Sequence, residues 1–62
     1  MSNETKLEQT LRHVIEGRRI VARQRALIER LRAAGHDSSH SEQLLEEFER
    51  TLAIFESDLR EL

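Results

Sequence analysis

The sequence predicts an all-α fold, an antiparallel two-helix hairpin over residues 1–62, and we expect this hairpin to dimerise into a four-helix bundle. Large apolar residues recur at alternating spacings of three and four along the last third of the chain, which is the heptad pattern of a helix with one apolar stripe. A single break over residues 34–39 divides the chain into two segments. Proline is absent and 35% of the residues are charged, which is typical of long solvated helices.

A first helix is expected over about residues 5–34. Thr5 and Glu8 have the spacing of a capping box, in which each side chain accepts a hydrogen bond from the other residue's backbone amide. The C-terminal half carries one stripe, made of Gly17, Ile20, Val21, Gln24, Leu27, Ile28 and Leu31. A second apolar group near the N-terminus is rotated away from this stripe, and we expect it to meet another surface. Its members are Leu7, Leu11, Val14 and Ile15.

The break is expected to form a turn over about residues 35–39. Gly35 stands where the end of a helix favours a residue that adopts positive φ without a steric penalty. Ser39 and Glu42 have the spacing of a second capping box, with Asp37 and Ser38 as alternative caps. The second helix is therefore expected over about residues 40–61.

The second helix carries the regular apolar stripe. Its members are Leu45, Phe48, Leu52, Phe55, Leu59 and Leu62. Leu44 and Ile54 lie on either flank of the stripe and widen the apolar surface beyond what one partner helix covers.

Because the connection is short, the two helices are expected to be antiparallel neighbours. Pairing residues outward from the turn places Gly17 opposite Leu59 and Gln24 opposite Leu52. The first helix then projects beyond Leu62, with residues 7–14 uncovered by its own chain. Gln24 interrupts the stripe, and a buried polar residue at such a position can fix the register of two helices.

One hairpin encloses little core, and chains this short are marginal unless something else stabilises them. Cysteine is absent, so no disulfide does so. We therefore expect a homo-oligomer, with a dimer favoured. The hairpin and oligomer interfaces are expected to contain Leu7, Leu11, Val14, Ile20, Val21, Gln24, Leu27, Ile28, Leu31, Leu44, Leu45, Phe48, Leu52, Ile54, Phe55, Leu59 and Leu62.

The two halves of the chain carry opposite charge. Residues 1–36 contain eight Lys or Arg and four Glu, giving +4, and residues 37–62 contain two Arg and eight Asp or Glu, giving −6, which sums to the net charge of −2. Arg18, Arg25 and Arg32 are seven residues apart beside the apolar stripe, so we expect them to pair with carboxylates of the second helix. Nucleic-acid binding is the less favoured use of these arginines, because the second helix is acidic and no Tyr or Trp is present to stack on bases.

The segment from His13 to Gly17 resembles the His-x-x-Lys-Gly motif of histidine phosphotransfer domains, which are four-helix bundles. The resemblance implies a His13 that accepts a phosphoryl group and a Gly17 that leaves room for a receiver domain. Glu16 stands where that family has lysine, and its carboxylate would repel a phosphoryl group. The alternative is a histidine at the rim of the bundle without chemistry.

Other chemistry has few candidate residues. His36, Asp37 and His40 flank the turn, where a metal site is the alternative to turn and cap interactions. We expect neither an enzyme nor a bound metal or cofactor. No apolar run is long enough to span a membrane and no leader pattern is recognisable, so we expect a cytoplasmic protein without membrane contact.

Two longer stretches carry further resemblances. The first contains His13, Ile20, Gln24, Arg25, Ile28, Leu31, Gly35, His36 and Asp37, followed by Leu44, Leu45, Phe48, Glu49 and Leu52. It is similar to short bacterial helical-hairpin proteins without an established activity. Residues 41–46 resemble the Ser-Gln-x-x-x-Asp signature of the small hairpin aspartyl-phosphate phosphatases of sporulation control. Glu42 and Glu46 replace its Gln and Asp, so the resemblance implies no catalytic role here.

The sequence therefore predicts a self-associating helical hairpin that acts as a protein–protein interaction or regulatory module. The first alternative is an accessory of two-component signalling that acts on a receiver domain by phosphotransfer or as a phosphatase. The second alternative is nucleic-acid binding.

Overall fold

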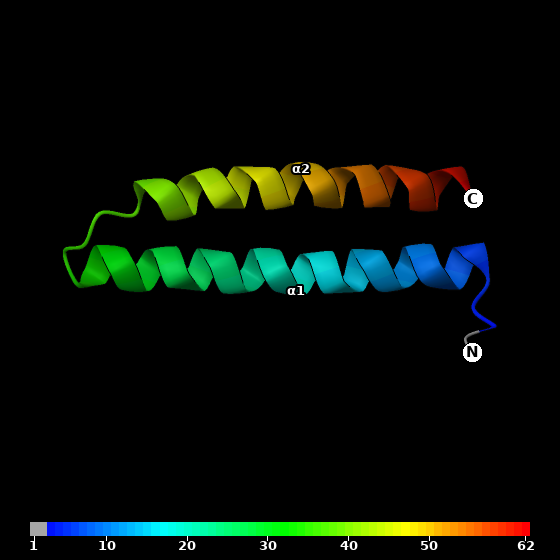
Figure 1. Ribbon diagram of the computed structural model, residues 1–62, viewed down its shortest axis with the longest axis horizontal. Coiled ribbons are helices and arrows are strands. Elements are labelled where there is room, and N and C mark those ends of the chain that lie inside the picture. The colour runs from blue at the N-terminus through cyan, green and yellow to red at the C-terminus, as the bar shows by residue number, and fades with distance from the viewer. Residues whose placement is uncertain (1–2) are drawn as a thin grey trace.

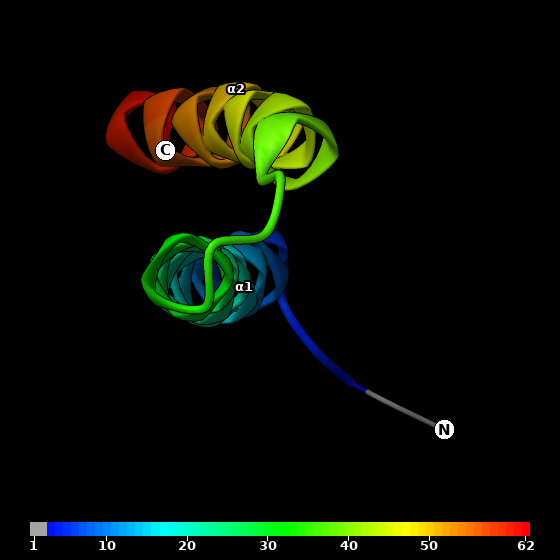
Figure 2. The same ribbon diagram turned by 90° about the vertical axis from the view of Figure 1, so that its left-hand side faces the viewer.

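The computed structural model describes residues 3–62, which form two helices joined by one turn. Helix α1 spans Lys6–Ala33 and helix α2 spans Ser39–Glu61. The helices run antiparallel (Figure 1), and a view along the molecule shows one helix stacked over the other (Figure 2). The predicted all-α hairpin is confirmed, and it measures 46 Å along its longest axis.

Helix α1 begins with the predicted capping box. The backbone N–H of Glu8 donates to Thr5 Oγ1 at 3.1 Å, and the backbone N–H of Thr5 donates to Glu8 Oε1 at 3.2 Å. These bonds satisfy two amides that have no partner inside the helix, which typically stabilises a helix start by about 1 kcal/mol.

Helix α1 ends at a glycine with the expected positive φ. Gly35 has a φ of 75°. Its N–H donates to the carbonyl of Arg32 at 3.0 Å, and the N–H of His36 donates to the carbonyl of Leu31 at 2.8 Å. This pair of bonds is the Schellman motif, which uses the last carbonyls of the helix and turns the chain away from its axis.

The start of α2 differs from the predicted Ser39–Glu42 capping box. Ser39 is the first helical residue and Ser38 is the cap residue. The Asp37 carboxylate accepts hydrogen bonds from the Ser39 N–H at 3.0 Å and from its hydroxyl at 2.7 Å. The buried Ser38 hydroxyl donates to Glu42 Oε2 at 2.8 Å. Asp37 therefore competes successfully for the amide and the hydroxyl of Ser39, as short acidic side chains often do in turns.

The buried line of α1 repeats every seven residues. Val14, Val21 and Ile28 are between 1% and 5% exposed, and Thr10 is also buried. The expectation that Val14 faces another surface is therefore wrong. Val14 lies two heptads before Ile28 and falls on the same line of the helix, so it packs against α2.

Of the rest of the N-terminal apolar group, Leu11 and Ile15 lie off this line, and Leu7 lies on it in the first turn of α1, one heptad before Val14. Leu7, Leu11 and Ile15 are between 43% and 54% exposed. Helix α2, which lies wholly within the described range, contains no buried residue at all. The hairpin interface thus covers one line of α1 fully and the stripe of α2 only in part.

The register of the hairpin differs from the predicted one by one heptad. A Cβ atom placed on Gly17 would lie 3.0 Å from Leu52 Cδ1, so Gly17 faces Leu52 and not Leu59. The predicted overhang of residues 7–14 is also absent, because the C-terminal end of α2 lies nearly level with the first turn of α1 (Figure 1).

The physical reason is that a shift of seven residues keeps the same side chains in the seam. The apolar pattern alone is satisfied by either register. In the observed one, Leu52 fits against the bare backbone of Gly17. The end of α1 projects past the start of α2 at the turn, and residues 34–38 run back over it (Figure 1).

Candidate interaction surface

One long edge of the hairpin is closed by ion pairs between the helices. We call this row the charged edge. Its pairs are Arg18–Glu56 at 3.0 Å, Arg25–Glu49 at 2.8 Å and Arg32–Glu42 at 2.6 Å. The prediction that these arginines pair with carboxylates of the second helix is confirmed. The three arginines are seven residues apart on α1, and the three glutamates are seven residues apart on α2. Each of these guanidinium groups therefore already has a carboxylate partner on the other helix.

The opposite long edge is lined mainly by apolar side chains. On α1 its row consists of Lys6, His13, Ile20 and Leu27, and on α2 of Leu44, Thr51 and Asp58, each spaced by seven residues. Phe48 and Phe55 lie beside the α2 row. We call Ile20, Leu27, Leu44, Phe48 and Phe55 the apolar edge, and all five are half-buried.

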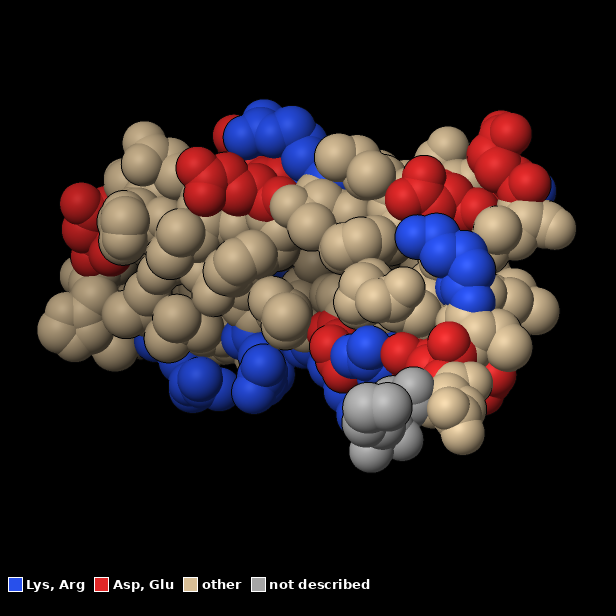
Figure 3. Space-filling view, turned by 45° about the vertical axis from the view of Figure 1, so that its right-hand side comes forward, with Lys and Arg blue, Asp and Glu red and all other residues tan. Residues whose placement is uncertain are grey.

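Figure 3 shows this side of the molecule as a broad area without charged side chains. Basic side chains gather along its α1 margin towards the left of the view, and acidic side chains, with basic ones among them, lie along its α2 margin. An apolar area with a polar border is typical of a surface that another protein covers.

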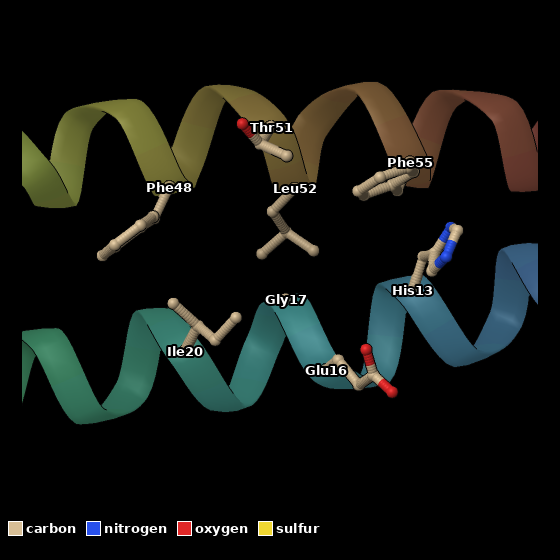
Figure 4. A pocket seen from close by; sticks show the side chains of 8 residues that line it. All are labelled: His13, Glu16, Gly17, Ile20, Phe48, Thr51, Leu52 and Phe55. Atoms are coloured by element: carbon tan, nitrogen blue, oxygen red, sulfur yellow. The ribbon is translucent and has the colours of Figure 1, made fainter.

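A shallow pocket of about 110 Å³ opens on the apolar edge. It is lined by His13, Glu16, Gly17, Ile20, Phe48, Thr51, Leu52 and Phe55. Figure 4 shows Leu52 reaching from α2 towards Gly17 between the two phenylalanines, with Ile20 pointing from α1 towards α2. The pocket is small and mostly apolar, so it suits an aliphatic side chain better than a polar ligand.

His13 lies at one end of this pocket and packs on an aromatic ring. The centroids of the His13 and Phe55 rings are 4.7 Å apart, with the rings tilted by 45°. Leu52 occupies the space over Gly17, so this glycine does not leave open room beside the histidine. Glu16 lines the same pocket. The geometry is that of a packed rim histidine, without the open glycine and the cation that the phosphotransfer motif supplies.

Gln24 makes a polar contact inside the hairpin. Its Nε2 donates to the backbone carbonyl of Ser41 at 2.8 Å. Within residues 3–62, no buried side-chain nitrogen or oxygen lacks a hydrogen-bond partner. Gln24 is opposite the first turn of α2 and not opposite Leu52, which agrees with the register set by Gly17.

The N-terminal part of α1 carries a second ionic cluster, which meets the apolar edge at Glu16. The Arg12 guanidinium lies 3.0 Å from Glu4 and 3.5 Å from Glu16. Its hydrogen bond holds the pKa of the Glu4 carboxyl below its usual value, and the same contact raises the pKa of Arg12. These exposed contacts join the residues before α1 to the helix surface.

Of the candidate metal ligands at the turn, Asp37 takes part in hydrogen bonds of the turn. Asp37 accepts two hydrogen bonds from Ser39, and these bonds lower the pKa of its carboxyl. In the part of the chain that the structure describes, no group of three His, Asp or Glu side chains is arranged to hold a metal ion. Neither helix has an apolar stretch of the length needed to cross a membrane.

The predicted interface residues fall into three classes of burial. The buried ones are Val14, Val21 and Ile28, and the half-buried ones are Ile20, Gln24, Leu27, Leu31, Leu44, Leu45, Phe48, Leu52, Phe55 and Leu59. The exposed ones are Leu7, Leu11, Ile54 and Leu62. Thr10 is also buried, at 3% exposed, and was not among the predicted interface residues. Its position four residues before Val14 and seven before Gly17, which continues the alternating spacing of the stripe, is the signal that could have found it.

A comparison with protein-family models, curated proteins and solved structures finds no match for this chain, so its function is inferred from the chemistry of the two edges.

Proposed function

We propose that the protein is a self-associating helical hairpin, in which a second copy covers the apolar edge, and that it acts as a protein–protein interaction module. The observation that carries this proposal is the incomplete burial of the apolar stripe of α2. The helix presents large apolar residues at heptad spacing, yet none of its residues is buried in the hairpin. A stripe of this kind is stabilised only when more surface covers it.

The small core supports the same proposal. Val14, Val21 and Ile28 are the buried apolar residues of the described chain. A 62-residue chain without cysteine has no disulfide to compensate for so small a core. Covering the apolar edge adds a second layer of buried aliphatic and aromatic groups, and each fully buried large side chain contributes roughly 1.5–3 kcal/mol.

The charge distribution favours the apolar edge over the charged edge as the covered surface. The arginines of the charged edge already have carboxylate partners in the same chain. Burying these pairs under a second copy would remove charged groups from water, which costs free energy. The apolar edge carries no such penalty along Ile20, Leu27 and Leu44.

Sedimentation equilibrium at micromolar concentration tests the proposal. We expect the mass of two chains of 7.3 kDa. Ile54 is 61% exposed and borders the apolar edge on α2, so Ile54→Glu should leave the hairpin folded and weaken self-association by roughly tenfold or more.

Ile15→Glu is the matched control, because Ile15 is also exposed, at 43%, but lies on the other flank of α1. We expect it to leave the mass unchanged. A single-chain mass for the native protein, with its helical circular dichroism intact, would end the proposal. Equal effects of the two substitutions would show that the apolar edge is not the covered surface.

A further inference from the structure

On the basis of the proposed self-association, we infer that the two copies dock with their turns at the same end. In this arrangement, α1 of each copy lies against α2 of the other, and Arg23 pairs with Glu47 of the second copy. The inference rests on two independent features of the apolar edge, its gradient of polarity along the helices and the charge of its two margins.

The apolar edge changes character from one end to the other. Leu27 and Leu44 are its row members near the turn, and His13 and Asp58 are their counterparts near the chain ends. The pairing of Gly17 with Leu52 and of His13 with Phe55 fixes this register, which places Leu27 level with Leu44 and His13 level with Asp58.

Docking with the turns at the same end places side chains of similar polarity against one another. The leucines of both copies form one apolar layer, and the imidazole and carboxylate groups of both copies form one polar layer at the other end. Docking with the turns at opposite ends places Asp58 of one copy against Leu44 of the other. A carboxylate buried against leucine without a partner is strongly unfavourable, so the first arrangement is preferred.

The margins of the edge carry complementary charge. Arg23 and Arg30 border it on α1, and Glu47 borders it on α2. Among the described residues, none of these three has an ion-pair partner within 4.0 Å. In Figure 3, basic side chains gather below the uncharged area at the left of the view, and acidic side chains, with basic ones among them, lie above it.

With the turns together, the basic margin of one copy meets the acidic margin of the other. The register that places Leu27 level with Leu44 brings Arg23 level with Glu47 of the second copy. With the turns at opposite ends, α1 lies against α1, and the basic margins face each other for part of their length. Electrostatic complementarity therefore selects the same arrangement as the apolar gradient.

A spin-label distance measurement tests the orientation. The native chain has no cysteine, so His36→Cys supplies a single labelling site at the turn. His36 is exposed and contributes its backbone N–H to the end of α1, which cysteine retains. We expect a distance between the two labels on the order of 20–30 Å, about two helix diameters.

The other outcomes distinguish a failure of the inferred orientation from a failure of the proposed self-association. A distance of roughly 40 Å or more, close to the 46 Å length of the hairpin, would place the turns at opposite ends and overturn the inferred orientation. The absence of dipolar coupling between chains would overturn the self-association on which the orientation rests.

A charge exchange tests the pairing of Arg23 with Glu47. We expect Arg23→Glu and Glu47→Arg each to weaken the dimer by roughly threefold to tenfold, because each places like charges together. The double variant should return to within about twofold of the native affinity.

Arg23→Glu combined with Glu16→Arg is the matched control. Glu16 and Arg23 are equally far from the middle of α1 and lie on one face, so they would pair between copies if α1 lay against α1. Rescue by this control, or the failure of Glu47→Arg to rescue Arg23→Glu, would overturn the inferred pairing.

Discussion

The two long edges of the hairpin share one heptad register and differ in what they do with it. On the charged edge, arginines of α1 form ion pairs with glutamates of α2 in the same chain, at 2.6–3.0 Å. On the apolar edge, Ile20, Leu27 and Leu44 occupy the equivalent positions and remain half-buried. An edge that satisfies its own groups needs no partner, whereas an edge of partly covered aliphatic groups gains free energy from one.

The largest expected effect comes from making the two edges alike. Arg25→Leu combined with Glu49→Leu replaces the central ion pair of the charged edge by two leucines. We expect this variant to acquire a second apolar surface and to form assemblies above the dimer at micromolar concentration, because hairpins with two open edges can stack repeatedly. Sedimentation velocity would detect the larger species.

The matched control removes the same charges and adds the same leucines elsewhere. Arg50→Leu combined with Glu46→Leu changes two exposed positions of α2 that make no ion pair with α1 among the described residues. We expect its mass to stay that of the native protein. Equal aggregation of both variants would mean that added hydrophobicity, and not the position on the edge, controls assembly.

The next effect concerns Gly17, which allows Leu52 to lie inside the hairpin and not out on the apolar edge. A leucine at this position would meet Leu52, since even a Cβ would lie 3.0 Å from Leu52 Cδ1. We expect Gly17→Leu to lower the free energy of unfolding by about 1–3 kcal/mol, measured by urea denaturation at a fixed protein concentration.

Leu52→Ala in the Gly17→Leu background should recover part of that loss, because it exchanges the large and small partners. Gly17→Ala is a milder control, in which the gain in helix propensity of about 1 kcal/mol offsets the displacement of one flexible methyl group. A Gly17→Leu variant as stable as the native chain would contradict the register that places Gly17 against Leu52.

The register is also the point at which the sequence was least informative. The hairpin, the capping box at Thr5 and the positive φ of Gly35 follow from local chemistry, and the arginine pairs follow from the heptad spacing of opposite charges on the two helices. Whether Gly17 faces Leu52 or Leu59 does not, because the stripe of α2 repeats every seven residues and either register buries the same pattern. The fit of one glycine and the bond from Gln24 to Ser41 distinguish the registers, and both are tertiary contacts.

The two edges also differ in how well the sequence predicted them. The spacing of Arg18, Arg25 and Arg32 predicted one edge correctly, because opposite charges at heptad spacing have few other uses in a hairpin. The apolar edge was predicted only as a set of interface residues. Val14 was assigned to the wrong surface because a helical wheel spreads a seven-residue repeat over a wider arc than two packed helices do.

A smaller effect is expected from breaking one pair of the charged edge. The Arg25 and Glu49 side chains are 61% and 43% exposed, so water screens their attraction. We expect Arg25→Met to change the free energy of unfolding by no more than about 1 kcal/mol and to leave the mass unchanged. The loss in free energy of unfolding should be smaller still in about 1 M salt. A loss of several kcal/mol would contradict the expectation that this exposed ion pair contributes little to stability.

The smallest expected effect is the pH dependence of the charged edge at its turn end. A hydrogen bond from the Ser38 hydroxyl, with the nearby Arg32 guanidinium, lowers the pKa of Glu42. A carboxyl group with a lowered pKa in the folded state stabilises the fold above its ordinary pKa, and this contribution is lost as the pH falls through the lowered value. Acidification from about pH 6 to pH 3 should therefore reduce the thermal midpoint.

Asp37 and Glu4 also have lowered pKa values and act in the same direction, so the comparison must isolate Glu42. Glu42→Gln should lower the midpoint at about pH 6 by a few degrees at most and should make the loss on acidification smaller than in the native protein. Glu29→Gln, an exposed position without an ion-pair partner among the described residues, serves as the control. If both variants lose as much on acidification as the native chain does, the Ser38–Glu42–Arg32 contact does not contribute to closing this edge.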